Sequence, residues 1–209
     1  MKIVIEGPSA VGKTKLCRSI EAEFAAYTVQ ETIVEPIPGC SPAEEAIHYL
    51  NQEVHRWQIS EEMERKHPLV LLDTDPFKSL WFNKAFGYMN CMGLQELDIF
   101  FGPLVAAGEL RFPDLYILLD ADEHELQRRK EQDSHRERHE FEWVSLANEM
   151  RRRYYRQINH LLPGSVWFIH AIDADATVRE VCRRIPILKP GKLSYDNYAS
   201  MIRWLAVHN

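Results

Sequence analysis

A loop near the start of the chain has residue types and a spacing suited to binding phosphate. Residues 7–14 read GPSAVGKT, which matches the pattern G-x-x-x-x-G-K-[ST]. Glycines at these places let the backbone curl so that successive N–H groups point at phosphate oxygens. Lys13 can then reach the β- and γ-phosphates of a nucleotide, and the Thr14 hydroxyl can bind Mg²⁺. The residues expected to hold MgATP are Gly7, Ser9, Ala10, Val11, Gly12, Lys13 and Thr14.

Acidic residues stand where two predicted strands end. Glu35 closes a β-branched segment (27–35), and Asp73 lies near the end of an apolar run (68–76). In an open parallel sheet, ligands bind outside the carboxyl ends of the strands. We therefore expect Asp73 to act with Thr14 on the metal ion. We expect Glu35 to accept a proton from the phosphate acceptor.

Each of these carboxylates also has a simpler interpretation. Glu35 could be a structural or a substrate-binding group, and Asp73 could cap the helix that starts near Pro76. Asp75 stands closer to that helix and is the better candidate for its cap. Asp120, at the end of a later strand, could face the site, but it precedes a helix, and capping of that helix by Asp122 or Asp120 is the simpler interpretation.

The elements that must position these residues alternate between strands and helices. Helical spacing of apolar residues follows the loop, and a long helical pattern over 43–66 follows a capping box of Ser41, Pro42 and Glu44. Such alternation indicates βαβ units and a parallel sheet. We predict an α/β fold with three α/β/α layers and a five-stranded parallel sheet, whose strands are residues 2–6, 27–35, 68–76, 114–120 and 165–171.

The last part of the sequence differs in character from the rest. Residues 186–192 (PILKPGK) have the composition of a linker, and an amphipathic segment follows them. This segment is predicted to be a helix that packs back on the core, with a dimer contact as the alternative. The chain therefore divides into a main domain over 1–185 and an appendage over 186–209.

Composition and charge disfavour several classes of protein. The chain has 209 residues, 45% of them hydrophobic and 27% charged, which is typical of a globular protein with one core. A net charge of −6 argues against binding to duplex DNA. No apolar run approaches the ~18 residues of a membrane span, and the four cysteines are scattered. We expect a cytoplasmic protein with no nucleic-acid or membrane partner, and a homodimer is possible.

Two kinds of nucleotide-binding protein are disfavoured by their missing motifs. A GTPase needs N-K-x-D to read the base, but Asn83-Lys84 is followed by Ala-Phe. A motor or AAA-type ATPase usually has adjacent Asp and Glu residues that activate water. Here Asp73 and Asp75 are separated by a threonine, and the chain is short for a motor.

Short segments beyond the loop carry a resemblance to a known family. They are IEG at 5–7, VEP at 34–36, WQISEEMER at 57–65 and LLDTD at 71–75. These segments resemble the nucleoside and nucleotide kinase branch of the P-loop proteins, the deoxynucleoside kinases and thymidylate kinases. The resemblance implies the P-loop NTPase fold, with Glu35 as the general base. It also implies Gln58 and Arg65 as substrate-binding residues; an exposed polar helix face is the alternative for them.

An arginine-rich segment resembles the lid of these kinases. Residues 128–142, RRKEQDSHRERHEFE, have no apolar periodicity. Arginine suits phosphate because its planar guanidinium donates two parallel hydrogen bonds and stays charged. We expect a lid over about 128–141 in which Arg136 and Arg138 close over the phosphates, with Arg128 in the preceding helix. A solvated charged helix is the alternative, and a solvated face is the interpretation of the later arginines, Arg151, Arg152, Arg153 and Arg156.

The sequence also departs from the pattern of these families. Thr74 stands where both have an arginine, and Ser79 stands where deoxynucleoside kinases often have a base-reading aspartate. The DTD of 73–75 and the D-x-x-R of Asp133–Arg136 are more similar to nicotinamide riboside kinase domains of bacterial NAD-salvage proteins. The phosphate acceptor is therefore expected to be nucleoside-like, without a narrower assignment.

These patterns predict an enzyme that transfers the γ-phosphate of MgATP to a hydroxyl of a nucleoside-like small molecule. One alternative is a nucleoside monophosphate kinase. Such an enzyme needs further cations for the phosphate of its acceptor, and the absence of an arginine at position 74 of this chain, which has Thr74 there, counts against it. The other alternative is a nucleotide-binding regulator or ATPase.

Overall fold

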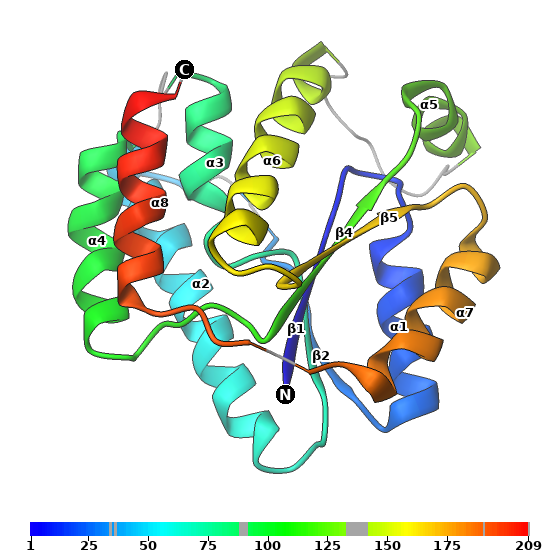
Figure 1. Cartoon of the computed structure of the whole chain (residues 1–209). Coiled ribbons are helices and arrows are strands. Elements are labelled where there is room, and N and C mark those ends of the chain that lie inside the picture. Colours follow the sequence, from blue (N-terminus) through cyan, green and yellow to red (C-terminus); the bar gives the residue numbers. More distant parts are fainter. Residues whose placement is uncertain (34, 36, 88–91, 133–141, 190, 209) are drawn as a thin grey trace.

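A five-stranded parallel sheet forms the centre of the molecule (Figure 1). The structure, a computed structural model, describes every residue except 34, 36, 88–91, 133–141, 190 and 209. The order of strands across the sheet is β2-β3-β1-β4-β5, and all pairings are parallel, which confirms the predicted fold class. Along the chain the strands are β1 (Lys2–Glu6), β2 (Tyr27–Val29), β3 (Val70–Asp73), β4 (Leu115–Asp120) and β5 (Val166–His170).

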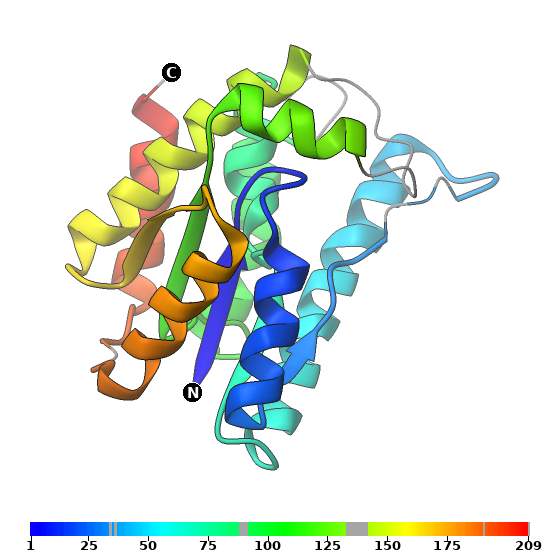
Figure 2. The same cartoon turned by 90° about the vertical axis from the view of Figure 1, so that its right-hand side faces the viewer.

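Helices cover both faces of the sheet (Figures 1 and 2). One face carries α1 (Lys13–Phe24) and α7 (Ala174–Arg184). α5 (Glu123–Gln132) lies beyond the carboxyl ends of the strands, and a 3₁₀ turn (Ile185–Ile187) follows α7. The other face carries five helices: α2 (Pro42–Glu64), α3 (Lys78–Ala85), α4 (Leu94–Ala106), α6 (Glu142–Leu161) and α8 (Tyr195–Val207).

Side chains of the three central strands, β1, β3 and β4, alternate between two apolar cores. In β1, Val4 belongs to the core under α2, α3, α4, α6 and α8, whereas Ile3 and Ile5 belong to the core under α1 and α7. Both faces are buried, which explains why the strands appear in the sequence as continuous apolar runs. The same alternation decides on which face each strand-end acid lies.

The long helix α2 begins where its capping box predicted. Ser41 Oγ accepts the N–H of Glu44 at 3.4 Å, and the Glu44 carboxylate accepts the N–H of Ser41 at 2.8 Å. Pro42 is the first helical residue, a position at which the missing N–H costs nothing.

The second strand is much shorter than predicted. β2 ends at Val29, and residues 30–33 form no strand. β2 is an edge strand paired with β3, and β3 turns away at Thr74, where φ is 78°. Without a partner backbone beyond that turn, the β-branched residues that follow cannot extend the ladder. The prediction of a strand over 27–35 was therefore wrong after residue 29, and Glu35 does not close a strand.

The C-terminal segment forms α8, which packs against α4 and α6. Tyr198, Met201 and Leu205 are fully buried in this contact, and the Tyr198 hydroxyl donates to Asp98 Oδ1 at 3.1 Å. The apolar face that the sequence shows is thus covered by the chain itself. Within the described residues, no helix has the length and apolarity needed to span a membrane.

Gly7 allows β1 and β4 to approach at the start of the phosphate-binding loop. A Cβ atom there would lie 2.6 Å from the Leu119 carbonyl oxygen and 2.9 Å from Val11 Cγ1. We predict that Gly7→Ala lowers the free energy of unfolding by about 1–3 kcal/mol, as overpacking does, measured by urea denaturation. Gly93→Ala is the control, because φ is −70° and the nearest atom is 3.4 Å away. If the free energy of unfolding falls equally in the two variants, the contact of Gly7 with β4 does not limit the side chain at position 7.

Candidate phosphoryl-transfer site

The predicted phosphate-binding loop joins β1 to α1 at the carboxyl edge of the sheet. Gly12 and Ala10 have left-handed backbones, with φ of 104° and 66°. Turns of this kind gather backbone N–H groups into a concavity that binds anions. Lys13, the first residue of α1, donates from Nζ to the carbonyl oxygens of Gly7 (3.0 Å) and Pro8 (3.5 Å). The lysine therefore lies across the loop, next to the place for phosphates.

The structure brings Thr14 and Asp73 together. The Thr14 hydroxyl donates to Asp73 Oδ2 at 3.1 Å, and the residue Asp73 is 4% exposed. Its other oxygen, Oδ1, is buried and has no hydrogen-bond partner. Burial raises the pKa of Asp73, and Lys13 offsets this only in part because Glu31 and Glu6 add negative charge. A buried carboxylate with a free oxygen beside a hydroxyl is the oxygen donor set that Mg²⁺ prefers, so these residues fit that ion.

A carboxylate that the sequence analysis missed, Glu31, lies beside this pair. Its side chain, 40% exposed, forms an ion pair with Lys78 at the start of α3 (3.2 Å). Partial burial alone would raise the pKa of Glu31, but Lys78 and Lys13 hold it below its ordinary value. Glu31 is the acid that follows the true end of β2, and overestimating the length of that strand hid it.

Glu35, the predicted base, lies elsewhere. It is exposed, and its backbone carbonyl oxygen accepts the hydroxyl of Tyr49 from α2. Its carboxylate makes no hydrogen bond or ion pair with the part of the chain that the structure describes. The expected convergence of Glu35 with Asp73 is therefore not found, and Glu31 is the carboxylate that lies close to Asp73.

The turn after β3 is held by a buried arginine from α2. Thr74 is 3% exposed and has φ of 78°, which is unusual for a β-branched residue. Arg56 donates from Nη2 to the carbonyl oxygens of Asp73 (2.5 Å) and Thr74 (3.1 Å), and it pairs with Glu53. Thr74 stands in place of the arginine of the families that the sequence resembles, and Arg56 and Lys78 bring cations to this region from two helices.

A buried acidic network lies under the loop and this turn. The Glu6 carboxylate accepts the N–H groups of Gly7 (2.8 Å) and Asp75 (3.2 Å), and so links the two segments. Asp75 is fully buried and accepts the Phe77 N–H (3.1 Å) and the Tyr155 hydroxyl (2.8 Å). Burial raises the pKa of Asp75 to about 7, and the charge of Glu6 adds to the effect. The bond to Phe77 closes the turn that precedes α3, but α3 begins at Lys78 with Phe77 as its N-cap residue and has no side-chain cap, so Asp75 is not the helix cap that the sequence predicted.

Arg129 on α5 links the loop to the end of β5. Its guanidinium donates to the carbonyl oxygens of Val11 (3.3 Å), Ala171 (2.8 Å) and Ile172 (2.6 Å). Its Nε donates to Glu125 at 2.6 Å. In the sequence, Arg129 is one member of an arginine-rich run, and nothing in that run shows which arginine faces inward.

The predicted lid falls largely outside the described residues. Arg128 belongs to α5, as predicted. Arg136 and Arg138, the two arginines expected to close over phosphates, lie within 133–141, which the structure does not describe. Their role stays a prediction.

Two of the arginines predicted to form a solvated face of α6 do not. Arg152 binds both carboxylate oxygens of Asp120, with N···O distances of 2.7 and 2.9 Å. Arg151 is 4% exposed. The prediction was wrong for both because α6 crosses the carboxyl edge of the sheet, so that these two positions face protein. Asp120, interpreted as a capping residue, anchors α6 to β4.

The residues predicted on α2 to bind substrate are not at the loop. Gln58 is exposed and follows the buried Arg56 by two residues, so it lies on the other side of the helix, since each residue turns by about 100°. Arg65 ends α2 beside Glu64, which pairs with Lys2 at the amino end of β1. Arg65 is therefore at the edge of the sheet opposite to the loop.

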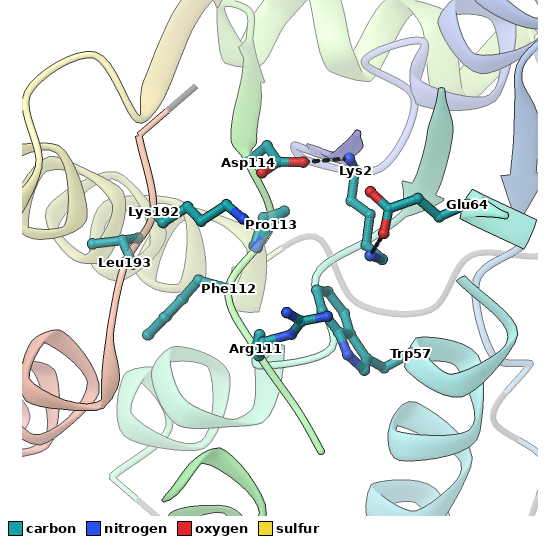
Figure 3. A pocket seen from close by; sticks show the side chains of 9 residues that line it. All are labelled: Lys2, Trp57, Glu64, Arg111, Phe112, Pro113, Asp114, Lys192 and Leu193. Atoms are coloured by element: carbon teal, nitrogen blue, oxygen red, sulfur yellow. Dashed lines mark hydrogen bonds and ion pairs between the residues drawn. The ribbon is translucent and has the colours of Figure 1, made fainter. Parts of the chain in front are cut away.

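A small cavity at this amino edge is separate from the site (Figure 3). Its volume is about 80 Å³, and Trp57, Arg111 and Phe112 are among the residues that line it. Lys2 and Glu64 also line the cavity, and they pair with each other. Its principal charges are already paired and β1 lies between it and the loop, so we assign it no part in phosphate binding.

Among the comparisons with known proteins, the one with solved structures finds matches to the fold. No protein-family model and no curated protein matches the sequence. A deoxyadenosine kinase from M. mycoides matches with a TM-score of 0.66 and 16% identity, over 90% of this chain and 100% of that one. The thymidylate kinase of Candida albicans matches with a TM-score of 0.62 and 12% identity, over 92% of this chain and 96% of that one. The thymidylate kinase of Ehrlichia chaffeensis matches with a TM-score of 0.54 and 14% identity, over 88% of this chain and 98% of that one.

The chain thus has the fold of the P-loop nucleoside and nucleotide kinases, as the sequence resemblance implied. At identities of 12–16% the similarity is one of architecture. The chemistry of this chain must be argued from its own site.

The buried carboxyl of Asp75 generates a prediction about stability and pH. The folded state raises its pKa to about 7, so the folded protein binds more protons than the unfolded chain between about pH 4 and pH 7. Stability should therefore fall as the pH rises through this window, by up to about 4 kcal/mol. Asp75→Asn should remove this dependence and be the more stable form at pH 8, measured by urea denaturation from pH 5 to pH 8.

Asp196→Asn provides the control, because Asp196 is exposed in the first turn of α8. In this variant the free energy of unfolding should change with pH as it does in the unaltered protein. If all three proteins lose stability in parallel between pH 5 and pH 8, Asp75 does not titrate in that range.

Proposed function

We propose that the protein is a kinase that transfers the γ-phosphate of MgATP to a hydroxyl of a nucleoside-like small molecule. One observation carries the proposal: the Thr14–Asp73 pair at the start of α1, with Asp73 Oδ1 buried and free. A loop that binds phosphates beside oxygen ligands for a metal is the donor half of a phosphoryl-transfer site. Similarity of fold to deoxyadenosine and thymidylate kinases supports the choice of acceptor class.

Different residues of the chain bind the different parts of MgATP, the phosphate donor. Backbone N–H groups of residues 7–14 and Lys13 Nζ bind the β- and γ-phosphates, while Thr14 and Asp73 would hold Mg²⁺, which supplies charge neutralisation there. Glu6 keeps the loop in place through the N–H of Gly7. The predicted lid residues Arg136 and Arg138 would shield the phosphates from water.

On the acceptor side we propose Glu31 as the proton acceptor. Glu31 takes the proton of the acceptor hydroxyl while that oxygen bonds to the γ-phosphorus and the bridging oxygen between the β- and γ-phosphorus leaves with ADP. Its partner Lys78 keeps the carboxylate ionised and near the transferring group. Its partial exposure makes it reachable by an acceptor, whereas Asp73 is buried and directed at Thr14.

A test of the function measures MgATP consumption against a panel of acceptors. The panel holds nucleosides, nucleoside monophosphates and nicotinamide riboside, with a reaction lacking acceptor. We expect acceptor-dependent ADP formation and a phosphorylated product, both abolished by Lys13→Ala, since that variant loses the cation at the β- and γ-phosphates. ADP formation at one rate with and without acceptors would instead indicate a nucleotide-hydrolysing regulator.

The two candidate bases can be separated by a matched pair of variants. Glu31→Gln should lower kcat by about 10²–10⁴-fold, the usual contribution of a general base, with KM for ATP changed little. Glu35→Gln removes the same charge from an exposed position and should keep kcat within about twofold. The reverse pattern in steady-state kinetics would return the role to Glu35.

A further inference from the structure

Three cations are buried in the part of the chain that the structure describes, and one of them has no counter-ion. Lys2 forms ion pairs with Glu61 and Glu64, and Arg56 pairs with Glu53. Arg151 is 4% exposed and forms no ion pair with the described residues. Burying a charge without a partner is costly, so an unpaired buried arginine calls for a reason.

The surroundings of Arg151 contain hydrogen-bond donors that lack acceptors. Its Nη2 donates to Asn148 Oδ1 at 2.7 Å, and its Nε has no partner. That bond uses the amide oxygen of Asn148, and Nδ2 is left without an acceptor. The guanidinium lies 5.7 Å from the ring of Trp81 on α3, whose Nε1 is also unpartnered. A group that only accepts hydrogen bonds, such as phosphate, matches this set.

Two nearby carboxylates act on Arg151 through their charge, but neither forms an ion pair or a hydrogen bond with it. Burial lowers the pKa of Arg151, and Glu6 and Asp120 are close enough to act against this. Glu6 accepts hydrogen bonds from the N–H groups of Gly7 and Asp75, and Asp120 accepts two hydrogen bonds from the guanidinium of Arg152.

The position of Arg151 is at the edge of the sheet where phosphates are expected. The next residue, Arg152, binds the end of β4, and Tyr155 one turn later binds the turn that follows β3. α3 and α6 pack side by side over this edge (Figure 1). The guanidinium therefore lies between the helix that begins at Lys78 and the strand end from which the phosphate-binding loop starts.

We propose that Arg151, with Asn148, binds a phosphate group during the reaction, either the terminal phosphate of the donor or a phosphate carried by the acceptor. The inference rests on the proposed kinase function and adds a residue to it. A guanidinium fork binds two phosphate oxygens in parallel and needs no proton exchange. If the phosphate belongs to the acceptor, the substrate is a nucleoside monophosphate.

The test compares Arg151→Met and Arg151→Lys with a matched control, Arg156→Met, which alters an exposed arginine one turn further along α6. Binding to the full chain is measured by calorimetry for four probes: MgADP, the magnesium salt of the β,γ-imido analogue of ATP, deoxynucleosides and deoxynucleoside monophosphates. We expect Arg151→Met to bind one phosphate-bearing probe about 10- to 100-fold more weakly, with Arg151→Lys intermediate. Arg156→Met should match the unaltered protein.

The pattern of losses tells the two phosphates apart. Weaker binding of the imido analogue, with MgADP unchanged, assigns Arg151 to the donor's terminal phosphate. Weaker binding of monophosphates, with deoxynucleosides unchanged, assigns it to the acceptor. The melting temperature without ligand is a further readout: Arg151→Met should equal or exceed the unaltered protein, because an unpaired buried charge is replaced by an apolar group of similar length.

Other results would overturn the proposal. If Arg151→Met binds all four probes as the control does, Arg151 holds no phosphate, while normal binding of the probes leaves the kinase function intact. If Arg151→Met lowers the melting temperature and keeps every affinity, its role is structural. If the unaltered protein binds none of the probes, the kinase function fails and this inference fails with it.

Discussion

The parallel register between β1 and β3 is the constraint on which the rest of the site depends. Ile5 pairs with Asp73, so the two strands end level with each other and the loop after β1 begins beside the turn after β3. The alternation of side chains then directs Asp73 toward α1, where Thr14 meets it, and Glu6 toward the opposite face. A slip of one residue would exchange these faces and separate the pair.

Among the described residues at this edge, the buried atoms of charged side chains have hydrogen-bond partners except at two points. Lys13, Arg56, Lys78 and Arg152 each contact carbonyl oxygens or a carboxylate of the chain. The two exceptions are a carboxylate oxygen, Asp73 Oδ1, and a guanidinium nitrogen, Arg151 Nε. One suits a cation and the other an anion. A metal ion bound to phosphates supplies both charges, so the exceptions agree with the chemistry proposed for the site.

Prediction from the sequence succeeded where a pattern of a few consecutive residues defines the feature. It failed where the feature depends on a segment that is distant in the sequence and close in the fold. The loop, the capping box of α2 and the five strands could be found because spacing and residue type define them within a few residues. The length of β2 could not be predicted in this way. An edge strand ends where its partner strand turns away, and β3, the partner of β2, turns at Thr74. That error put Glu35, and not Glu31, at the predicted end of the strand. The arginines of α6 were misjudged because a charge run does not reveal which of its members lies over the sheet.

The sequence by itself determined the fold class, the nucleotide-binding loop and the pairing of Thr14 with Asp73. All three follow from local pattern and from the rule that parallel strands end at one edge. Only the tertiary structure decided which further charged groups lie at this edge of the sheet. Glu31, Arg56, Lys78, Arg129 and Arg151 come from five segments of the chain; Arg129 contacts the loop, and the others lie around the ends of the strands. A polar residue type shows that a side chain can bind phosphate or move a proton, but burial and neighbours decide whether it faces the site or water.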